Sequence, residues 1–239
     1  MESLTGKVAV VTGGTRGIGR AIAERLLREG VLVAICGRTG ESVDRAVTEL
    51  SPMGTIFGQA ADVSQSGEVQ RFFQAVDAAL GGLDILVNNA GLGVFHKVGE
   101  MTAEEWHRNI DLNLNGPFYC SHEALARFRK RGGGFIVNIS SLAGKNAFSG
   151  GAGYNASKFG LNGFTEALML DHRFDNVRVS SIMPGSVDTG FGGGPSDRTG
   201  DLSWMIAPED VAEAVVLVLR MPARTMVSRV EMRPSRPKK

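Results

Sequence analysis

Short apolar runs rich in β-branched residues alternate with amphipathic stretches along the whole chain of 239 residues. Most of the runs are nearly continuous in apolar residues, as strands buried on both faces of a parallel sheet are. This alternation predicts a doubly wound α/β fold, with a parallel seven-stranded sheet and helices on both faces. The expected strands cover residues 8–12, 31–36, 55–61, 83–88, 135–140, 177–183 and 226–232. The expected helices cover residues 17–28, 42–50, 67–80, 103–131, 154–173 and 208–219.

Composition and charge narrow the class of protein. No Pro/Ser-rich linker divides the chain, so we expect residues 1–239 to form a single domain without internal repeats. The formal net charge of +1 gives no broad electrostatic basis for binding nucleic acid or an anionic membrane. No apolar run approaches the roughly 18 residues of a membrane helix, and residues 1–7 are too polar and short for a signal peptide. We therefore expect a cytoplasmic protein that binds neither nucleic acid nor membrane.

Cysteine and histidine usage argues against disulfides and metals. The two cysteines, Cys36 and Cys120, are too few for a disulfide framework, and we expect each to behave as a small buried apolar side chain. The four histidines have no partners at metal-ligand spacing. We expect no metal site.

Glycine is unusually common, with 32 residues, about twice the average usage in proteins. Because glycine in regular structure costs roughly 0.5–1 kcal/mol relative to alanine, this excess needs a backbone reason. One reason lies after the first strand, where Thr12-Gly13-Gly14-Thr15-Arg16-Gly17-Ile18-Gly19 leads directly into a helix. Glycines there permit a tight turn and let N–H groups at the helix N-terminus approach a pyrophosphate. A glycine-rich turn without a ligand is the alternative.

The spacing of these glycines, Gly-x-x-x-Gly-x-Gly, differs from the usual Gly-x-Gly-x-x-Gly dinucleotide pattern. The loop also lacks the Lys-Ser/Thr pair of a P-loop, which disfavours hydrolysis of a nucleoside triphosphate. A Rossmann fold binds its ligand at the carboxyl ends of the strands, which is where this loop lies. The loop therefore favours a dinucleotide.

The end of the second strand indicates which dinucleotide fits. An NAD site usually has an Asp or Glu there for the ribose 2′-hydroxyl, whereas an NADP site has neutral and basic residues for a 2′-phosphate. Here the chain reads Cys36-Gly37-Arg38-Thr39, with no carboxylate before Glu41. Arg38 can hold the phosphate by a charge-assisted bond, and Arg16 can approach from the first loop. The pattern favours NADP(H), with an ordinary solvated arginine at position 38 as the alternative.

In these features and several others, the chain resembles the single-domain short-chain dehydrogenases/reductases. The matching motifs occur in order over nearly the whole chain, each at an expected strand end or helix. They are the 12–19 loop, Asp62-Val63, Asn88-Asn89-Ala90-Gly91, Asn113, Ser141, Tyr154-x-x-x-Lys158, and Pro184-Gly185 with Thr189.

The resemblance implies a catalytic set of Ser141, Tyr154, Lys158 and Asn113. Tyr154 and Lys158 are four residues apart on an expected helix, so their side chains share one face. A free phenol has a pKa near 10, and an adjacent ammonium favours the phenolate, so we expect Lys158 to lower the pKa of Tyr154. Tyr154 can then exchange a proton with a carbonyl or alcohol oxygen, while Ser141 stabilises charge there. In the family the lysine also binds the nicotinamide ribose, and the asparagine holds a water that links Lys158 to a proton relay.

The resemblance also implies the cofactor contacts. Asp62 would accept a hydrogen bond from the adenine amino group, beside the backbone of Val63, and residues 184–189 would bind the nicotinamide end. Asn88 is better explained as joining strands through backbone hydrogen bonds. The full set of expected contacts is Gly13, Thr15, Arg16, Gly17, Ile18, Gly19, Arg38, Thr39, Asp62, Val63, Asn89, Ala90, Gly91, Tyr154, Lys158, Pro184, Gly185, Val187 and Thr189.

Residues 190–201 are nearly devoid of apolar anchors. In the family this region forms the substrate lid, so we expect a mobile lid over about residues 187–207, with a surface loop of no functional importance as the alternative. A mainly apolar set of side chains is expected to face the substrate but does not identify it. The set is Leu92, Val94, Phe95, Leu142, Lys145, Asn146, Phe148, Met183 and Trp204.

The C-terminal segment departs from a pattern common in the family. Many acyl-carrier-protein reductases of this fold end in a glycine-rich strand, whereas residues 227–234 here precede a short basic tail. This weakens an assignment to fatty-acid synthesis and resembles more closely the enzymes that act on small carbonyls or 3-hydroxy acids. We expect an NADPH-dependent reductase of a ketone or aldehyde, reversible as an alcohol dehydrogenase, and a homodimer or homotetramer. The alternatives are a 3-oxoacyl-thioester reductase and, from another class, a non-catalytic NADP(H)-binding regulator, which would need no proton donor.

Overall fold

The computed structural model describes residues 1–191 and 201–237. The strands form one seven-stranded sheet in the order β3-β2-β1-β4-β5-β6-β7, and every neighbouring pair is parallel. The predicted fold class, a doubly wound Rossmann fold, is confirmed. The strands are β1 (Val8–Thr12), β2 (Leu32–Gly37), β3 (Ile56–Ala60), β4 (Ile85–Asn88), β5 (Gly134–Ile139), β6 (Val177–Pro184) and β7 (Arg229–Met232).

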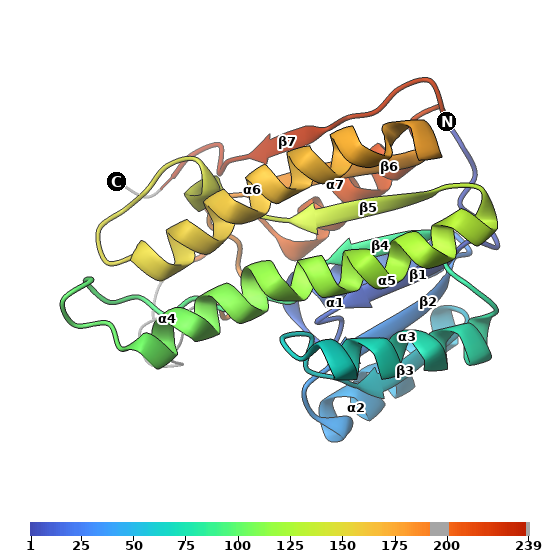
Figure 1. The fold of residues 1–239 in the computed structure, drawn as a ribbon, viewed down its shortest axis with the longest axis horizontal. Coiled ribbons are helices and arrows are strands. Elements are labelled where there is room, and N and C mark those ends of the chain that lie inside the picture. The colour runs from blue at the N-terminus through green and yellow to red at the C-terminus, as the bar shows by residue number, and fades with distance from the viewer. Residues whose placement is uncertain (192–200, 238–239) are drawn as a thin grey trace.

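Helices cover both faces of the sheet and bury two separate apolar layers (Figure 1). On one face, side chains such as Leu26 and Val215 pack from α1 (Gly17–Arg28), α2 (Gly40–Leu50) and α7 (Pro208–Leu219). On the other, Phe72, Phe128 and Leu168 pack from α3 (Ser66–Leu80), α5 (Gly116–Arg131) and α6 (Ala152–His172). Because both faces are covered, the central strands β1 and β4 are buried at every position, which explains their continuous apolar runs.

The helix expected over residues 103–131 is interrupted. It divides into α4 (Ala103–Ile110) and α5, joined by a π-helical segment at Asp111–Asn115. Pro117 lies in the first turn of α5 and has no N–H to donate to the preceding turn, which favours a wider turn there. The interruption places the buried Asn113 within the π-helical segment.

The last strand is shorter than the expected 226–232. Residues 226–228 run beside β6, but the N–H of Val179 donates to the Met226 sulfur at 3.4 Å, and the Ser180 hydroxyl donates to the Val227 carbonyl at 2.6 Å. The first backbone bond between the two segments runs from the Ser181 N–H to the Ser228 carbonyl at 2.9 Å, and the regular strand begins at residue 229. The other expected strands differ from the observed ones by at most two residues at either end.

The order of the strands reverses at β1, which pairs with β2 on one side and β4 on the other. Connections that leave β1 and β4 therefore run to opposite sides, and a crevice opens between their carboxyl ends. The glycine-rich loop follows β1 and the Asn88–Gly91 motif follows β4. The topology thus brings two motifs about 75 residues apart in sequence to one crevice.

Cys36 and Cys120 are both free and buried, as expected. Burial raises the pKa of the Cys36 thiol to about 12 and that of Cys120 well above its ordinary value. Within the described residues, no group of three or more His, Cys, Asp or Glu side chains could hold a metal ion. No helix in that part of the chain is both long and apolar enough to cross a membrane.

Candidate active site

A cleft of about 710 Å³ lies at the carboxyl edge of the sheet, with walls from the loops after β1 to β6 and from α6. Among the residues predicted for catalysis and cofactor binding, all except Asn113 line this cleft. It also contains residues that were not predicted, among them Cys36, Ser42, Arg45, Ser140, Phe191 and Met205. Arg45 lies three residues after Ser42 on the helix that follows β2, so the two side chains face the cleft from the same side of that helix.

The glycine-rich loop is attached to the β4 loop by Thr12. Its hydroxyl oxygen accepts hydrogen bonds from the backbone N–H groups of Asn89 and Ala90, each at 3.0 Å. In return, the Asn89 amide donates to the Thr12 carbonyl at 2.9 Å. Three hydrogen bonds therefore fix the two sides of the crevice relative to each other, and Thr12 acts as a positioning residue.

Two glycines are required by close approach inside this loop. A Cβ at Gly19 would lie 2.3 Å from both the Asn89 side-chain nitrogen and the Gly13 carbonyl oxygen. Gly13 itself has φ +64°, and a Cβ there would lie 3.0 Å from the Ala90 Cα. Any side chain at either position would push the loop away from β4. Part of the glycine excess is thereby explained by packing rather than by flexibility.

The N-terminus of α1 opens into the cleft without a capping side chain. Arg16 is the N-cap residue and makes no side-chain cap hydrogen bond, and the first-turn residues Gly17, Ile18 and Gly19 line the cleft. Free N–H groups and the positive end of the helix dipole are features of an anion site. The Ser140 hydroxyl, which also lines the cleft, is buried without a hydrogen-bond partner among the described residues. These unsatisfied groups fit a polar, anionic ligand such as a dinucleotide.

Three arginines line the end of the cleft beside β1 and β2: Arg16, Arg38 and Arg45. All are exposed, and none of them forms an ion pair with a carboxylate in the part of the chain that the structure describes. The one carboxylate in the lining is Asp62, and one of its oxygens accepts from the Ser64 N–H and hydroxyl, at 3.0 and 2.8 Å. This end of the cleft therefore carries a net positive charge.

Tyr154 lies at the other end, in the first turn of α6, and is 9% exposed. Its ring is flanked by Phe95 at 5.5 Å and by Phe191 at 5.7 Å between centroids. Burial raises the pKa of Tyr154, and a hydrogen bond with Ser141 opposes that rise. The direction is the opposite of the one expected from the sequence, because loss of hydration outweighs any effect of the neighbouring groups.

Lys158 lies one helical turn after Tyr154 and is 4% exposed. Its Nζ donates to the carbonyl of Ile139, at the end of β5, at 3.0 Å. Burial lowers the pKa of Lys158 to about 8. The lysine is therefore held between the end of a central strand and the helix that carries Tyr154.

Asn113 lies beside the cleft without lining it. Its amide donates to the Leu92 carbonyl at 2.8 Å and to the Ser157 hydroxyl at 3.0 Å, and its oxygen accepts from the Leu92 N–H at 2.9 Å. These bonds attach the π-helical segment to the loop after β4 and to α6. The described contacts give Asn113 a positioning role, and its expected link to a proton relay stays a prediction.

Asn88 lies opposite Asn138 in the backbone ladder between β4 and β5, as expected, and its side chain joins further elements. Its amide donates to Asn138 of β5 at 2.8 Å and to Ser121 of α5 at 3.2 Å.

Of the residues expected to face the substrate, Leu92 and Phe95 line the cleft. Lys145 instead forms an ion pair with Glu231 at 2.8 Å. The expected lid falls partly outside the described residues, at 192–200, and its two ends are joined by backbone bonds between Ser186, Asp188 and Ile206 at 3.0 Å.

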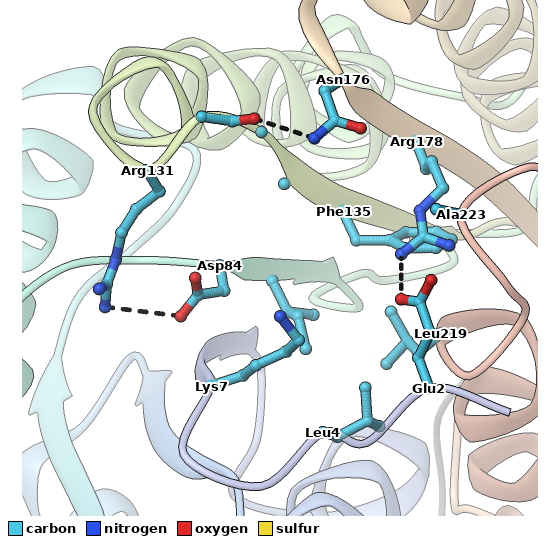
Figure 2. Close-up of a pocket in the computed structure, with 14 residues that line it drawn as sticks. Glu2, Leu4, Lys7, Asp84, Arg131, Phe135, Asn176, Arg178, Leu219 and Ala223 are labelled. Atoms are coloured by element: carbon cyan, nitrogen blue, oxygen red, sulfur yellow. Dashed lines mark hydrogen bonds and ion pairs between the residues drawn. The ribbon is translucent and has the colours of Figure 1, made fainter.

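A smaller cavity of about 220 Å³ lies at the opposite edge of the sheet, where the strands begin (Figure 2). Four of its charged groups form two ion pairs: Arg178 with Glu2 at 3.2 Å, and Arg131 with Asp84 at 3.5 Å. These pairs attach the N-terminal segment and the end of α5 to the strand starts. None of the predicted site residues is among the described residues that line this cavity.

Comparisons with known proteins agree with this site. The sequence profile described as "short chain dehydrogenase" matches residues 7–197. An uncharacterized oxidoreductase of Staphylococcus aureus (strain USA300) is 34% identical over 98% of this chain and 100% of its own length. A 3alpha-hydroxysteroid dehydrogenase of Mediterraneibacter gnavus is 35% identical over 90% of each chain.

Solved structures show the same likeness. An alcohol dehydrogenase of the archaeon Thermococcus sibiricus, complexed with 5-hydroxy-NADP, superposes with a TM-score of 0.89 and 31% identity, over 98% of this chain and 99% of that one. A metagenomic short-chain oxidoreductase in complex with NADP gives a TM-score of 0.85 and 36% identity, over 99% and 100% of the two chains. The chain belongs to the short-chain dehydrogenase family and is an oxidoreductase of that type.

Proposed function

We propose that this protein is an NADP(H)-dependent oxidoreductase that interconverts a ketone or aldehyde and the corresponding alcohol. The observation that carries the proposal is a cleft with three arginines at one end, which form no ion pair among the described residues, and the Ser141, Tyr154 and Lys158 side chains at the other. An NADP molecule matches these two ends, because it has a phosphorylated adenosine at one end and the reactive nicotinamide at the other.

The arginine end supports a preference for the 2′-phosphate. Arg38 lies two residues before α2, Arg45 lies on α2, and Arg16 lies in the glycine-rich loop, and all three line the cleft. No carboxylate follows β2 within this lining to accept a bond from a ribose 2′-hydroxyl. A dianionic phosphate would gain two or three charge-assisted hydrogen bonds here.

The tyrosine end supports proton exchange with a carbonyl oxygen. The raised pKa of Tyr154 keeps its phenol protonated at neutral pH, as an acid needs to be in the direction of reduction. The Ser141 hydroxyl is close enough to Tyr154 to bind the same oxygen and to stabilise its developing negative charge. When bound, NADPH supplies the hydride and becomes NADP⁺. Tyr154 supplies the proton, so the carbonyl gains the equivalent of H₂.

The proposal is tested by following NADPH absorbance with a broad panel of ketones and aldehydes, and by calorimetric titration of the protein with NADPH and NADH. We expect turnover of part of the panel and tighter binding of NADPH. Tight binding of NADPH without turnover of any compound would instead favour a non-catalytic regulator. Preference for NADH would contradict the role given to the arginines.

The homodimer or homotetramer expected from the family resemblance stays a prediction, as do the cytoplasmic location and the lid over residues 187–207. Sedimentation equilibrium of the purified chain would determine the oligomeric state.

A further inference from the structure

We propose that the substrate is a neutral carbonyl compound with a ring attached to the carbonyl carbon, and that this ring packs against the side chains of Phe95 and Phe191. The proposal rests on the function proposed above. It concerns the part of the cleft next to Tyr154, which the cofactor contacts do not explain.

The distribution of charge among the described residues favours a neutral substrate. In the described lining, the cationic side chains other than Lys158 are Arg16, Arg38 and Arg45, all at the adenosine end. Lys158 is buried and already donates to the Ile139 carbonyl. A carboxylate or phosphate beside Tyr154 would therefore lose hydration without gaining a cationic partner among the described residues. Lys145, the remaining basic residue expected near the substrate, pairs with Glu231 and does not line the cleft.

The aromatic geometry favours a ring. Phe95 contacts Tyr154 edge to face, with 5.5 Å between the ring centroids and 74° between the ring planes. Phe191 also contacts Tyr154, with 5.7 Å between the centroids and 54° between the planes. Phe95 and Phe191 remain 38% and 40% exposed, although both line the cleft. Two partly exposed rings beside a buried tyrosine leave apolar area that a planar or alicyclic ring would cover. Leu92 and Met205 complete the apolar lining.

Gly93 allows this arrangement. A Cβ at position 93 would lie 2.4 Å from the Phe95 ring and 3.1 Å from the Phe191 ring. Both rings therefore rest against the same glycine, although they come from loops after β4 and β6. Phe148 supports Phe95 from outside the cleft, at 5.8 Å between centroids. The ring positions are built by tertiary contacts on both sides.

Three carbonyl compounds test separately the effect of the substrate's charge and the effect of its ring. Ethyl benzoylformate and benzoylformate share the phenyl ketone but differ in charge, whereas ethyl benzoylformate and ethyl pyruvate share the ester but differ in phenyl against methyl. With NADPH, we expect kcat/KM to be at least about a hundredfold lower for benzoylformate than for its ester. We expect it to be at least about tenfold lower for ethyl pyruvate than for ethyl benzoylformate.

The Phe95→Leu variant tests whether Phe95 contacts the ring of the substrate. We expect it to lower the ratio of kcat/KM between ethyl benzoylformate and ethyl pyruvate by about two- to tenfold, because an aromatic contact is lost. The dissociation constant for NADPH should not change. The matched control is Phe159→Leu, because Phe159 lies on α6, is 46% exposed and does not line the cleft. It should leave the ratio unchanged.

Equal kcat/KM for the two esters, equal kcat/KM for benzoylformate and its ester, or the same change in ratio for both phenylalanine variants would overturn the substrate class. So would a protein that binds NADPH and reduces other carbonyl compounds but none of these three. The proposed oxidoreductase function would survive each of these results. It would fail only if the broad panel gave no turnover.

Discussion

The Nζ atom of Lys158 lies 5.8 Å from the centroid of the Tyr154 ring and donates a hydrogen bond to the Ile139 carbonyl at 3.0 Å. The ammonium is thus attached to the end of a central strand and faces the tyrosine from a fixed position. Burial affects the two groups in opposite ways, raising the pKa of the phenol and lowering that of the ammonium. Both shifts favour the neutral forms, and each leads to a measurable consequence.

Replacing the tyrosine hydroxyl should remove the proton donor without altering the cofactor end. For Tyr154→Phe we expect turnover of any accepted carbonyl compound to fall by about 10²–10⁴-fold, the usual contribution of a general acid. The dissociation constant for NADPH should stay within about twofold. Stopped-flow or steady-state absorbance and calorimetry measure the two quantities. Retention of full turnover would show that another group supplies the proton.

The buried lysine should make stability depend on pH. The pKa of Lys158 is about 8 in the folded protein against 10.5 as its ordinary value, so the unfolded chain binds more protons between these pH values. The cost of burying the charged form is present in full below pH 8 and disappears as the pH rises toward 10.5. We expect the free energy of unfolding to rise by up to about 3 kcal/mol over this range, relative to Lys158→Met, which has no charge to bury. Urea unfolding of both proteins at several pH values measures this difference, and a constant difference would contradict it.

The arginine next to β2 should discriminate between the two dinucleotides. For Arg38→Ala we expect NADPH to bind about ten- to a hundredfold more weakly, because charge-assisted hydrogen bonds to a phosphate each contribute about 1.5–3 kcal/mol. Binding of NADH should hardly change. Arg28→Ala is the control, since Arg28 pairs with Glu24 on α1 away from the cleft lining. An equal loss for both dinucleotides would remove Arg38 from the 2′-phosphate site.

The packing around Gly19 should not tolerate a methyl group. A Cβ there would lie 2.3 Å from Asn89 and Gly13 atoms, so we expect Gly19→Ala to lower the free energy of unfolding by about 1–3 kcal/mol and to weaken NADPH binding. Gly163→Ala on α6 is the control, because a Cβ there meets nothing within 4 Å. That change should stabilise the protein by about 0.5–1 kcal/mol. Denaturant unfolding of both variants tests the contrast.

The Thr12 hydroxyl should contribute measurably to the free energy of unfolding, because it accepts two backbone hydrogen bonds. Thr12→Val would leave the N–H groups of Asn89 and Ala90 without their acceptor, at a cost of about 1–3 kcal/mol in the free energy of unfolding. Thr12→Ser keeps the oxygen and should cost much less. If valine and serine had the same effect, the hydroxyl would not be what joins the two loops.

Local sequence patterns determined the fold class and most element boundaries, because burial on both faces of a parallel sheet leaves a continuous apolar run that can be seen without a structure. The same was true of the glycine-rich loop and of the Tyr154 and Lys158 pair, whose spacing is set by one helical turn. Sequence reasoning placed Arg38 correctly in the cleft lining but missed Arg45, since nothing local shows which face of α2 looks toward the crevice.

The tertiary structure alone decided the features that depend on residues distant in sequence. The direction of the pKa shift at Tyr154 was predicted wrongly, because pair spacing shows a neighbouring ammonium but not how far burial removes water from both groups. The π-helical segment around Asn113 and the placement of Phe95 and Phe191 beside Gly93 likewise arise from packing between separate loops and helices. The glycine-rich loop and the motif residues could therefore be identified from the sequence. The hydration of Tyr154 and Lys158, the distribution of charge along the cleft and the shape of its tyrosine end depend on the folded structure.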